Sequence, residues 1–228
     1  MKNHLKRLTA PKTWTIDRKI RKFITRPQPG GHRLDSSLPL NVILRDFLKK
    51  AHTTKEAKKM LHHKQVLVDG KIKINPRLPV GLFDVISFPE IKSSFRILLD
   101  QKGRLIITQI DETENNIKPC KIIGKKLLSQ KMQLNLHDGK NILVKKDFPI
   151  KVGDTVLITL PDLKIKETFP LQSSAFVFLT KGKCAGDSGI LKEINDNQAI
   201  YQKGRQTIET LKKYLFVLGN QKAAIKIE

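Results

Sequence analysis

The chain has 228 residues, with 44 lysines and arginines against 21 aspartates and glutamates, a formal net charge of +23. This excess is far beyond what solubility requires and favours nucleic acid as the partner. No apolar run approaches the roughly 18 residues that span a bilayer, so no membrane partner is predicted. The chain start lacks the apolar core of a secretory signal, and the two cysteines form no C-x-x-C pair. We therefore expect a cytoplasmic protein.

Residues 1–37 are predicted to be a basic N-terminal extension. Between residues 1 and 36, ten lysines and arginines stand against two aspartates. Prolines and a glycine pair interrupt any periodicity, so we expect the segment to stay extended until it meets phosphates. Trp14, Phe23 and Ile24 lie among the cations, and they could dock on other domains or pack against RNA; the sequence leaves both open. The candidate RNA contacts here are Arg7, Lys12, Arg18, Arg21 and Arg26.

A helix is predicted directly after Pro39, which suits a first helical turn. The apolar residues that follow it have the spacing of one helix face: Leu40, Ile43, Leu44, Phe47 and Leu48. The other face carries Arg45 and Lys49, and Lys50 follows.

A second helix is predicted from Thr53, because Thr53 and Glu56 have the spacing of a capping box. Basic residues share one face of this helix, namely Lys55, Lys58 and Lys59. Ala57, Met60 and Leu61 can pack against the first helix.

A hairpin is predicted at Asp69-Gly70, which separates two β-rich runs and suits a type I′ turn. Its tip bears Lys71. Lysine-rich helix faces are usually only solvated surface, but the net charge of the chain favours RNA binding here. Residues 38–90 therefore predict a compact RNA-binding module, with contacts at Arg45, Lys49, Lys50, Lys55, Lys58, Lys59 and Lys71.

Residues 91–173 change to a strand pattern. Two strand-like runs flank residues 100–103, two more flank Asp138-Gly139, and another covers residues 155–160. Short strands with tight turns predict a small β-barrel or sandwich. We interpret it as a scaffold, with candidate phosphate contacts at Lys125, Lys126, Lys145 and Lys146.

Residues 175–191 place an apolar strand, a glycine loop and a second strand start in succession. The loop glycines are Gly182, Gly186 and Gly189, and Lys181 and Lys183 are candidate RNA contacts. A P-loop is excluded because no Gly-Lys-Ser or Gly-Lys-Thr is present. The stretch resembles a KOW motif, the strand-loop-strand element of small SH3-like barrels.

The order of these segments resembles that of the S4e family of small-subunit ribosomal proteins. The matching stretches are residues 4–14, 26–32, 38–88, the KOW-like stretch and the closing strand 210–219. Leu44-Arg-Asp, Val68-Asp-Gly-Lys and residues 80–86 are the most specific pieces. Cys184 departs from the polar residue that the family usually carries in the KOW loop. The chain ends soon after Gly219, which favours the archaeal type of this archaeal and eukaryotic family.

The resemblance implies an α+β, multidomain protein. Its parts would be a basic extension (1–37), a two-helix and hairpin S4-type RNA-binding domain (38–90), a central β-barrel-like domain (91–173) and a KOW-type SH3-like barrel (174–228). The implied function is that of a structural constituent of the small ribosomal subunit, which binds and stabilises small-subunit rRNA in translation. Neighbouring small-subunit proteins would be further partners, and no cofactor or small-molecule substrate is expected.

Two other interpretations remain open at this point. A KOW-containing transcription or translation factor would bind RNA transiently. An RNA-modifying enzyme could carry the S4-type domain, but no nucleophile has a recognisable base partner. His62 and His63 cannot both face one site from a helix, and no further ligand has metal-binding spacing. We therefore expect neither an enzyme nor a metal site.

Overall fold

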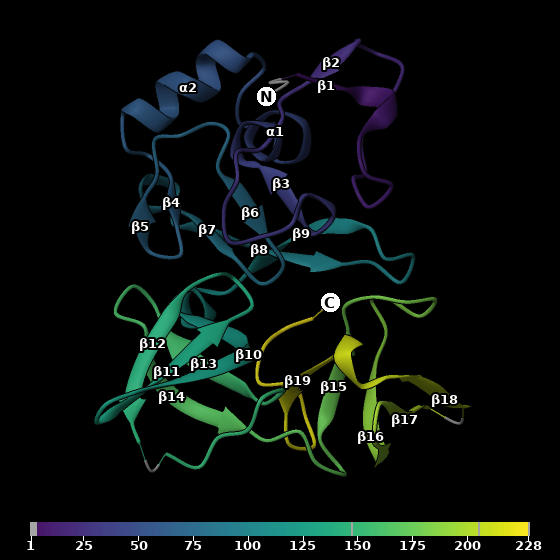
Figure 1. Cartoon of the computed structure of the whole chain (residues 1–228). Helices are drawn as coiled ribbons and strands as arrows, with labels where there is room; N and C mark the ends of the chain where they lie inside the picture. Colours follow the sequence, from purple (N-terminus) through teal and green to yellow (C-terminus); the bar gives the residue numbers. More distant parts are fainter. Residues whose placement is uncertain (1–3, 147, 205, 228) are drawn as a thin grey trace. The chain divides into compact units, whose positions relative to one another are not determined.

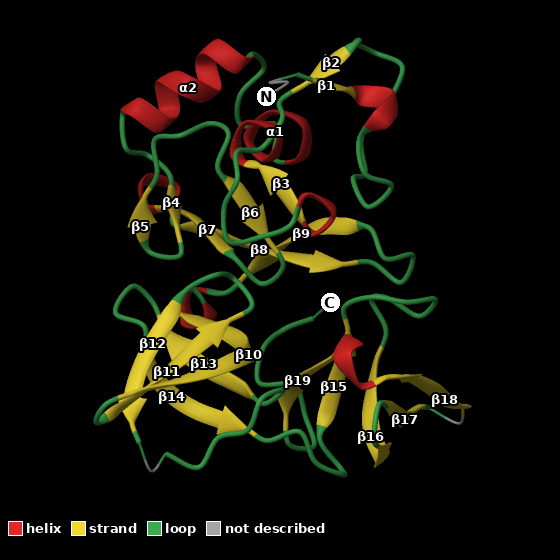
Figure 2. Ribbon diagram, in the orientation of Figure 1, coloured by secondary structure: helices red, strands yellow, loops and turns green. Residues whose placement is uncertain are grey.

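The computed structural model describes residues 4–146, 148–204 and 206–227. Lys2, part of the predicted basic extension, lies outside these residues. The chain forms two compact units. The first runs to Leu98 and includes Arg104–Asn116; the second contains Leu99–Gly103 and the residues from Ile117 onward. Few helices and many antiparallel strands give the mixed fold that the sequence predicted (Figures 1 and 2).

The N-terminal segment folds against the first unit, so the prediction that it stays extended is wrong. Its β1 (Leu5–Lys6) pairs antiparallel with β2 (Phe23–Ile24), and two 3-10 turns cover Arg7–Thr9 and Leu34–Ser36. Trp14 is only 2% exposed and bridges Leu105, while Ile24 is 6% exposed. These apolar side chains are buried within the protein itself, so RNA is not needed to cover them. Phe23 stays 49% exposed.

Both predicted helices are present. The first consists of α1 (Leu40–Val42) and a wider π-helical turn (Ile43–Phe47), and it buries Leu40, Ile43 and Leu44. The second is α2 (Thr54–His62). Its capping box is confirmed, because the Glu56 amide donates to Thr53 Oγ1 at 3.2 Å and Glu56 Oε2 accepts from the His52 amide at 2.8 Å.

Besides the β1–β2 pair, the first unit contains a second two-stranded sheet and a five-stranded sheet. β3 (Ser37–Pro39) pairs with β6 (Pro79–Gly81), and the larger sheet has the order β5 (Lys71–Ile72), β4 (Leu67–Val68), β7 (Val85–Phe88), β8 (Ser93–Leu99), β9 (Leu105–Ile110). Asp69 and Gly70 have φ of 51° and 71°, as the predicted hairpin requires. β8 and β9 continue this sheet across the predicted domain boundary at residue 90.

The second unit contains two five-stranded antiparallel sheets. The first has the order β12 (Asn141–Lys145), β11 (Lys131–Leu136), β10 (Ile117–Leu128), β13 (Thr155–Thr159), β14 (Lys164–Phe169). The second has the order β18 (Gln206–Leu211), β17 (Gln198–Lys203), β16 (Ser188–Asn195), β15 (Phe176–Leu179), β19 (Leu215–Gly219). The hairpin at Asp138-Gly139 is confirmed. The predicted closing strand, residues 210–219, is not continuous: it covers the end of β18, a 3-10 turn (Lys212–Tyr214) and β19.

The loop between β15 and β16 has the predicted strand-loop-strand form. Gly182 and Gly186 adopt φ of 97° and 89°, which favour glycine. Gly189 was predicted in this loop but lies in β16, where a side chain would collide with the carbonyl of Gln202. The identification of this element as a KOW motif stays a prediction.

A buried ion pair lies inside the second unit. Lys118 Nζ is 2.8 Å from Asp138 Oδ2, and the two side chains are 0% and 1% exposed. Burial by itself raises the pKa of Asp138, but the charges of Lys118, His137 and Lys140 outweigh it and hold that pKa well below its usual value. The carboxylate is therefore ionised at neutral pH.

We expect Lys118→Met to lower the free energy of unfolding by about 3–5 kcal/mol, because it leaves a buried carboxylate without its nearest cation. Urea unfolding followed by circular dichroism measures the change. Adding Asp138→Asn removes the stranded charge, so the double variant should recover part of the loss. A single variant as stable as the original protein would contradict this role for the pair.

Candidate nucleic-acid interface

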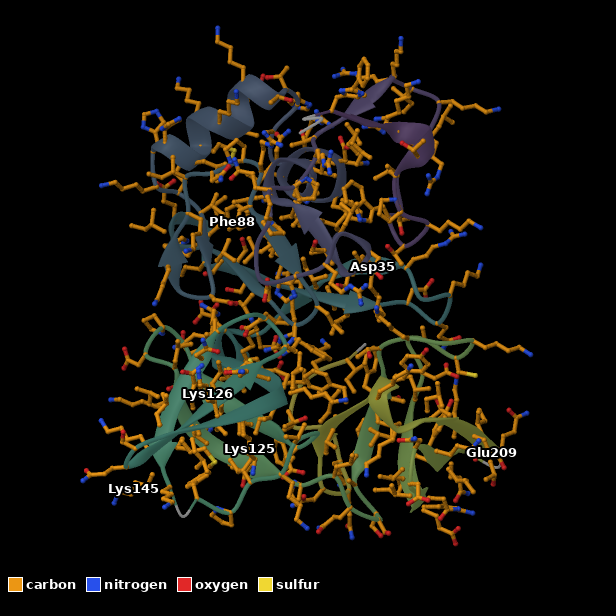
Figure 3. The ribbon with its side chains drawn as sticks, viewed as in Figure 1. Asp35, Phe88, Lys125, Lys126, Lys145 and Glu209 are labelled. Carbon is orange, nitrogen blue, oxygen red and sulfur yellow. The ribbon has the colours of Figure 1, made fainter. Side chains whose placement is uncertain are left out.

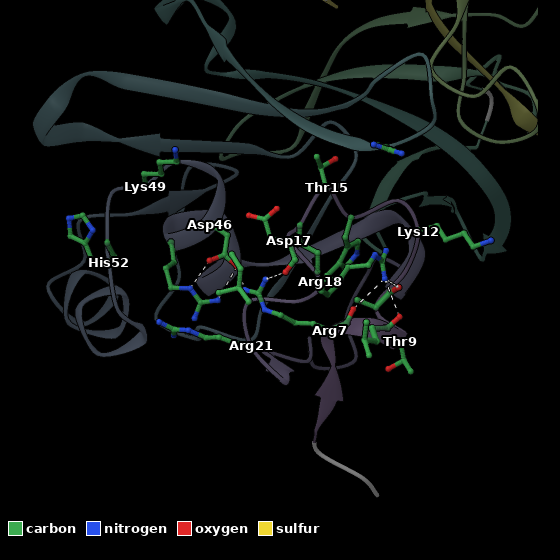
Figure 4. Close-up of a pocket in the computed structure, with 18 residues that line it drawn as sticks. Arg7, Thr9, Lys12, Thr15, Asp17, Arg18, Arg21, Asp46, Lys49 and His52 are labelled. Carbon is green, nitrogen blue, oxygen red and sulfur yellow. Dashed lines mark hydrogen bonds and ion pairs between the residues drawn. The ribbon is translucent and has the colours of Figure 1, made fainter.

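An open cavity of about 1080 Å³ lies in the first unit, between the N-terminal segment and the π-helical turn (Figure 4). Its lining comes from residues 7–21, residues 45–52 and Arg104. Six of the predicted RNA contacts meet there: Arg7, Lys12, Arg18, Arg21, Arg45 and Lys49. Residues far apart in the sequence thus form one basic surface.

The carboxylate of Asp46 holds two arginines in the wall of this cavity. Arg7, whose side chain is only 6% exposed, pairs with Asp46 through Nη2 at 2.9 Å and donates from Nη1 to the Asp17 carbonyl at 2.6 Å. Arg45 binds the same carboxylate through Nε at 2.7 Å and Nη2 at 3.0 Å. The hydrogen bond to Asp46 raises the pKa of Arg45 above its usual value. Asp46 thus joins the N-terminal segment to the helix.

The Arg18 side chain holds together the loop of residues 7–11, which forms the rest of the cavity wall. Its guanidinium donates to four backbone carbonyls at 2.9–3.3 Å, those of Arg7, Leu8, Ala10 and Pro11. The sequence predicted phosphate contacts at Arg7, Arg18 and Arg45. The structure instead directs most of their donors into the protein, and their contact with RNA stays a prediction.

Four other cations of the lining are exposed: Lys12, Arg21, Lys49 and Arg104. Within the described parts of the chain, their side chains make no hydrogen bond or ion pair. Arg104 was missed by the sequence analysis, because it follows the β8–β9 turn and reaches the cavity only through folding. Leu8 and Ile20 also line the cavity and are 69% and 67% exposed. Free cations beside apolar groups suit RNA phosphates together with riboses and bases.

A second basic surface is the outer face of α2. Lys55, Lys58 and Lys59 are exposed there, while Ala57 and Leu61 on the opposite face are fully buried. This arrangement confirms the predicted division of the helix into a basic and an apolar face. Its use by RNA stays a prediction.

The other predicted contacts lie outside the cavity. Lys50 follows the π-helical turn, and Lys71 begins β5 at the hairpin; both are exposed. The Arg26 carbonyl accepts from Arg77 Nε at 2.9 Å. Lys181 and Lys183 lie in the β15–β16 loop of the second unit.

Cys120, His137 and Asp138 bring three potential metal-ligand atoms close together in the second unit. The Asp138 oxygen nearest Cys120 already accepts a hydrogen bond from Lys118. The group therefore belongs to the buried ion pair. Across the ranges that the structure describes, no helix has both the length and the apolar character needed to cross a bilayer.

Comparison with known proteins identifies the family. The profile of the ribosomal family S4e matches residues 91–165, and that of the RS4NT domain matches residues 1–35. Small ribosomal subunit protein eS4 of Methanocaldococcus jannaschii is 41% identical, over 99% of this chain and 98% of the relative. The chain belongs to the S4e family. The resemblance seen in the sequence is thereby confirmed.

Further S4e proteins agree with this assignment. Small ribosomal subunit protein eS4 of Methanocella arvoryzae is 38% identical, over 98% of this chain and 97% of the relative. The crystal structure of 30S ribosomal protein S4e from Thermoplasma acidophilum has a TM-score of 0.71 at 29% identity. The match covers 82% of this chain and 96% of that one, so the mixed fold is an S4e fold.

We expect Arg18→Gln to loosen the S4e N-terminal loop, because it removes charged donors from four carbonyls, at a cost of about 1–3 kcal/mol. Trp14 is the only tryptophan, so its fluorescence reports this loop directly. The emission should shift to longer wavelength, and acrylamide should quench it more strongly. Arg21→Gln is the matched control, since the Arg21 side chain makes no hydrogen bond or ion pair with any residue that the structure describes. Equal spectra for the two variants would refute the role of Arg18.

Proposed function

We propose that this S4e protein is a structural constituent of the small ribosomal subunit, which binds and stabilises small-subunit rRNA in translation beside neighbouring small-subunit proteins. The cytoplasmic ribosome is its proposed location. Family membership supports the ribosomal role. The observation that carries RNA binding is the cavity of the first unit, whose opening is lined by four cations that pair with none of the residues described. We propose no catalytic activity.

Electrostatics explains how such a surface binds RNA. Each cation that neutralises a phosphate releases condensed counterions, and binding weakens with salt by a slope of about 0.7–0.9 per contact. Folded RNA is recognised largely by the shape of its backbone, so cations must be held in fixed positions. The hydrogen bonds of Arg7 and Arg18 hold the loop that carries Lys12. The cavity cations are therefore pre-organised.

We further propose that the outer face of α2, Lys50, Lys71 and the β15–β16 loop add contacts to the same RNA. In this proposal residues 38–90 act as an S4-type module, residues 91–173 as a central scaffold and residues 174–228 as a KOW-type barrel. A transiently bound KOW factor is the rival function. Co-sedimentation distinguishes them: a constituent stays with the small subunit through a high-salt wash, and a transient factor is released.

Two variants test the cation assignment. Charge reversal of Lys55, Lys58 and Lys59 to Glu should weaken binding to a full-length small-subunit rRNA transcript and flatten the salt slope by about two to three. Changing Lys12, Arg21, Lys49 and Arg104 to Gln should do the same. Filter binding across a salt series measures both quantities.

The control variant reverses three exposed lysines of the second unit, Lys151, Lys166 and Lys192. It carries the same change in net charge as the α2 variant. If it weakens binding as much as the α2 variant does, the effect is one of total charge. Unchanged affinity and slope in the α2 and cavity variants would overturn the assignment.

A further inference from the structure

A third basic surface lies in the second unit, on one face of β10, β11 and β12. The register places Lys126 opposite Gln133, and Gln133 opposite Leu143. It also places Leu128 opposite Lys131, and Lys131 opposite Lys145. Because side chains alternate along strands, these residues share one face. We call this the outer sheet face: Lys126, Leu128, Lys131, Gln133, Leu143 and Lys145. Figure 3 labels Lys126 and Lys145.

Among the described residues, no acidic side chain pairs with the lysines of this face. Lys131 and Lys145 stand directly opposite each other, and like charges in this position destabilise a sheet. Asp138 is the only acidic residue between positions 117 and 146, and it is buried against Lys118. In the described structure, Lys126, Lys131 and Lys145 have no hydrogen-bonding or ion-pairing partner. The face therefore carries a repulsion that an anion would relieve.

Exposed apolar groups separate these lysines. Leu128 is 38% exposed and Leu143 is 56% exposed. Lysines at sheet edges often serve to prevent aggregation, which would account for Lys145 on the edge strand β12. It does not account for Lys131, which has a strand on either side, nor for the exposed Leu143 on the edge strand. Cations interleaved with apolar and amide groups fit a ligand that has both phosphates and flat bases.

We propose that the outer sheet face binds a segment of RNA distinct from the one held at the cavity of the first unit. The inference rests on the proposed RNA-binding function and extends it. The lysines contact phosphates, and Leu128, Leu143 and Gln133 pack against riboses and bases. The protein then contacts two segments of small-subunit rRNA, one through each unit.

Cross-linking of assembled small subunits tests the location. Ultraviolet irradiation followed by mass spectrometry should find nucleotide adducts on peptides from residues 126–145. The adducts should map to an rRNA segment different from that linked to residues 49–59. Peptide–peptide cross-links alone on this face would show a protein partner and overturn the proposal. Adducts to the same rRNA segment would overturn the claim of two segments.

A variant with Lys126, Lys131 and Lys145 changed to Gln tests the energetics. It should flatten the salt slope for the full-length small-subunit rRNA transcript by about two to three. The free variant should melt at the same temperature or higher, because the Lys131–Lys145 repulsion is gone. If these lysines were only solvated surface, the variant would not combine weaker RNA binding with unchanged or higher stability.

The matched control changes Lys151, Lys166 and Lys192 to Gln, which removes equal charge from other exposed positions of the second unit. Equal loss of affinity in both variants would overturn the outer sheet face as a site. If the unmodified protein binds the transcript but the outer-face variant binds equally well, this inference fails and the proposed function stands. If the unmodified protein does not bind the transcript, the proposed function itself fails.

Discussion

The interaction on which the first unit depends is the pairing of two arginines with one carboxylate. Arg7 is buried, and a buried guanidinium is costly unless a counter-charge and hydrogen-bond acceptors surround it. Asp46 supplies the charge, and the Asp17 carbonyl supplies a further acceptor. Because Asp46 lies on the π-helical turn, its pairing with Arg7 fixes the N-terminal segment to that turn, and Arg45 binds the same carboxylate. The cavity wall forms where these groups meet.

The protein uses its cations in two different ways. Arg7, Arg18 and Arg45 hold backbone and carboxylate oxygens with several donors each, a role that suits the planar guanidinium. Lysines such as Lys12, Lys49 and those of α2 remain exposed, where a flexible ammonium can follow a phosphate backbone. The second unit repeats the division, with Lys118 buried against Asp138 and the outer sheet face exposed. Net charge alone therefore overstates the number of cations available to RNA.

Local patterns were predictable because their causes are local. The Thr53–Glu56 capping box and the turn at Asp69-Gly70 depend on residues only a few positions apart. The folding of the N-terminal segment was not predictable in this way, because Arg7 and Asp46 are 39 positions apart and Trp14 reaches Leu105. β10 was missed because it contains Pro119; it pairs with β13 at its start and with β11 only after residue 121. The resemblance to the S4e family was visible in the sequence because several complete motifs occur in the order that the family has.

We propose that internal pairing, rather than total charge, shapes the cavity that binds RNA. The affinity of the Asp46→Asn variant for small-subunit rRNA tests this proposal. The control is Glu112→Gln on an exposed turn, which raises the net charge by the same amount. Charge alone predicts tighter binding for both variants. We predict that Asp46→Asn binds about tenfold more weakly, a loss of about 1.4 kcal/mol, while the control binds as before or slightly better. Binding by Asp46→Asn as tight as that of the control would contradict the claim.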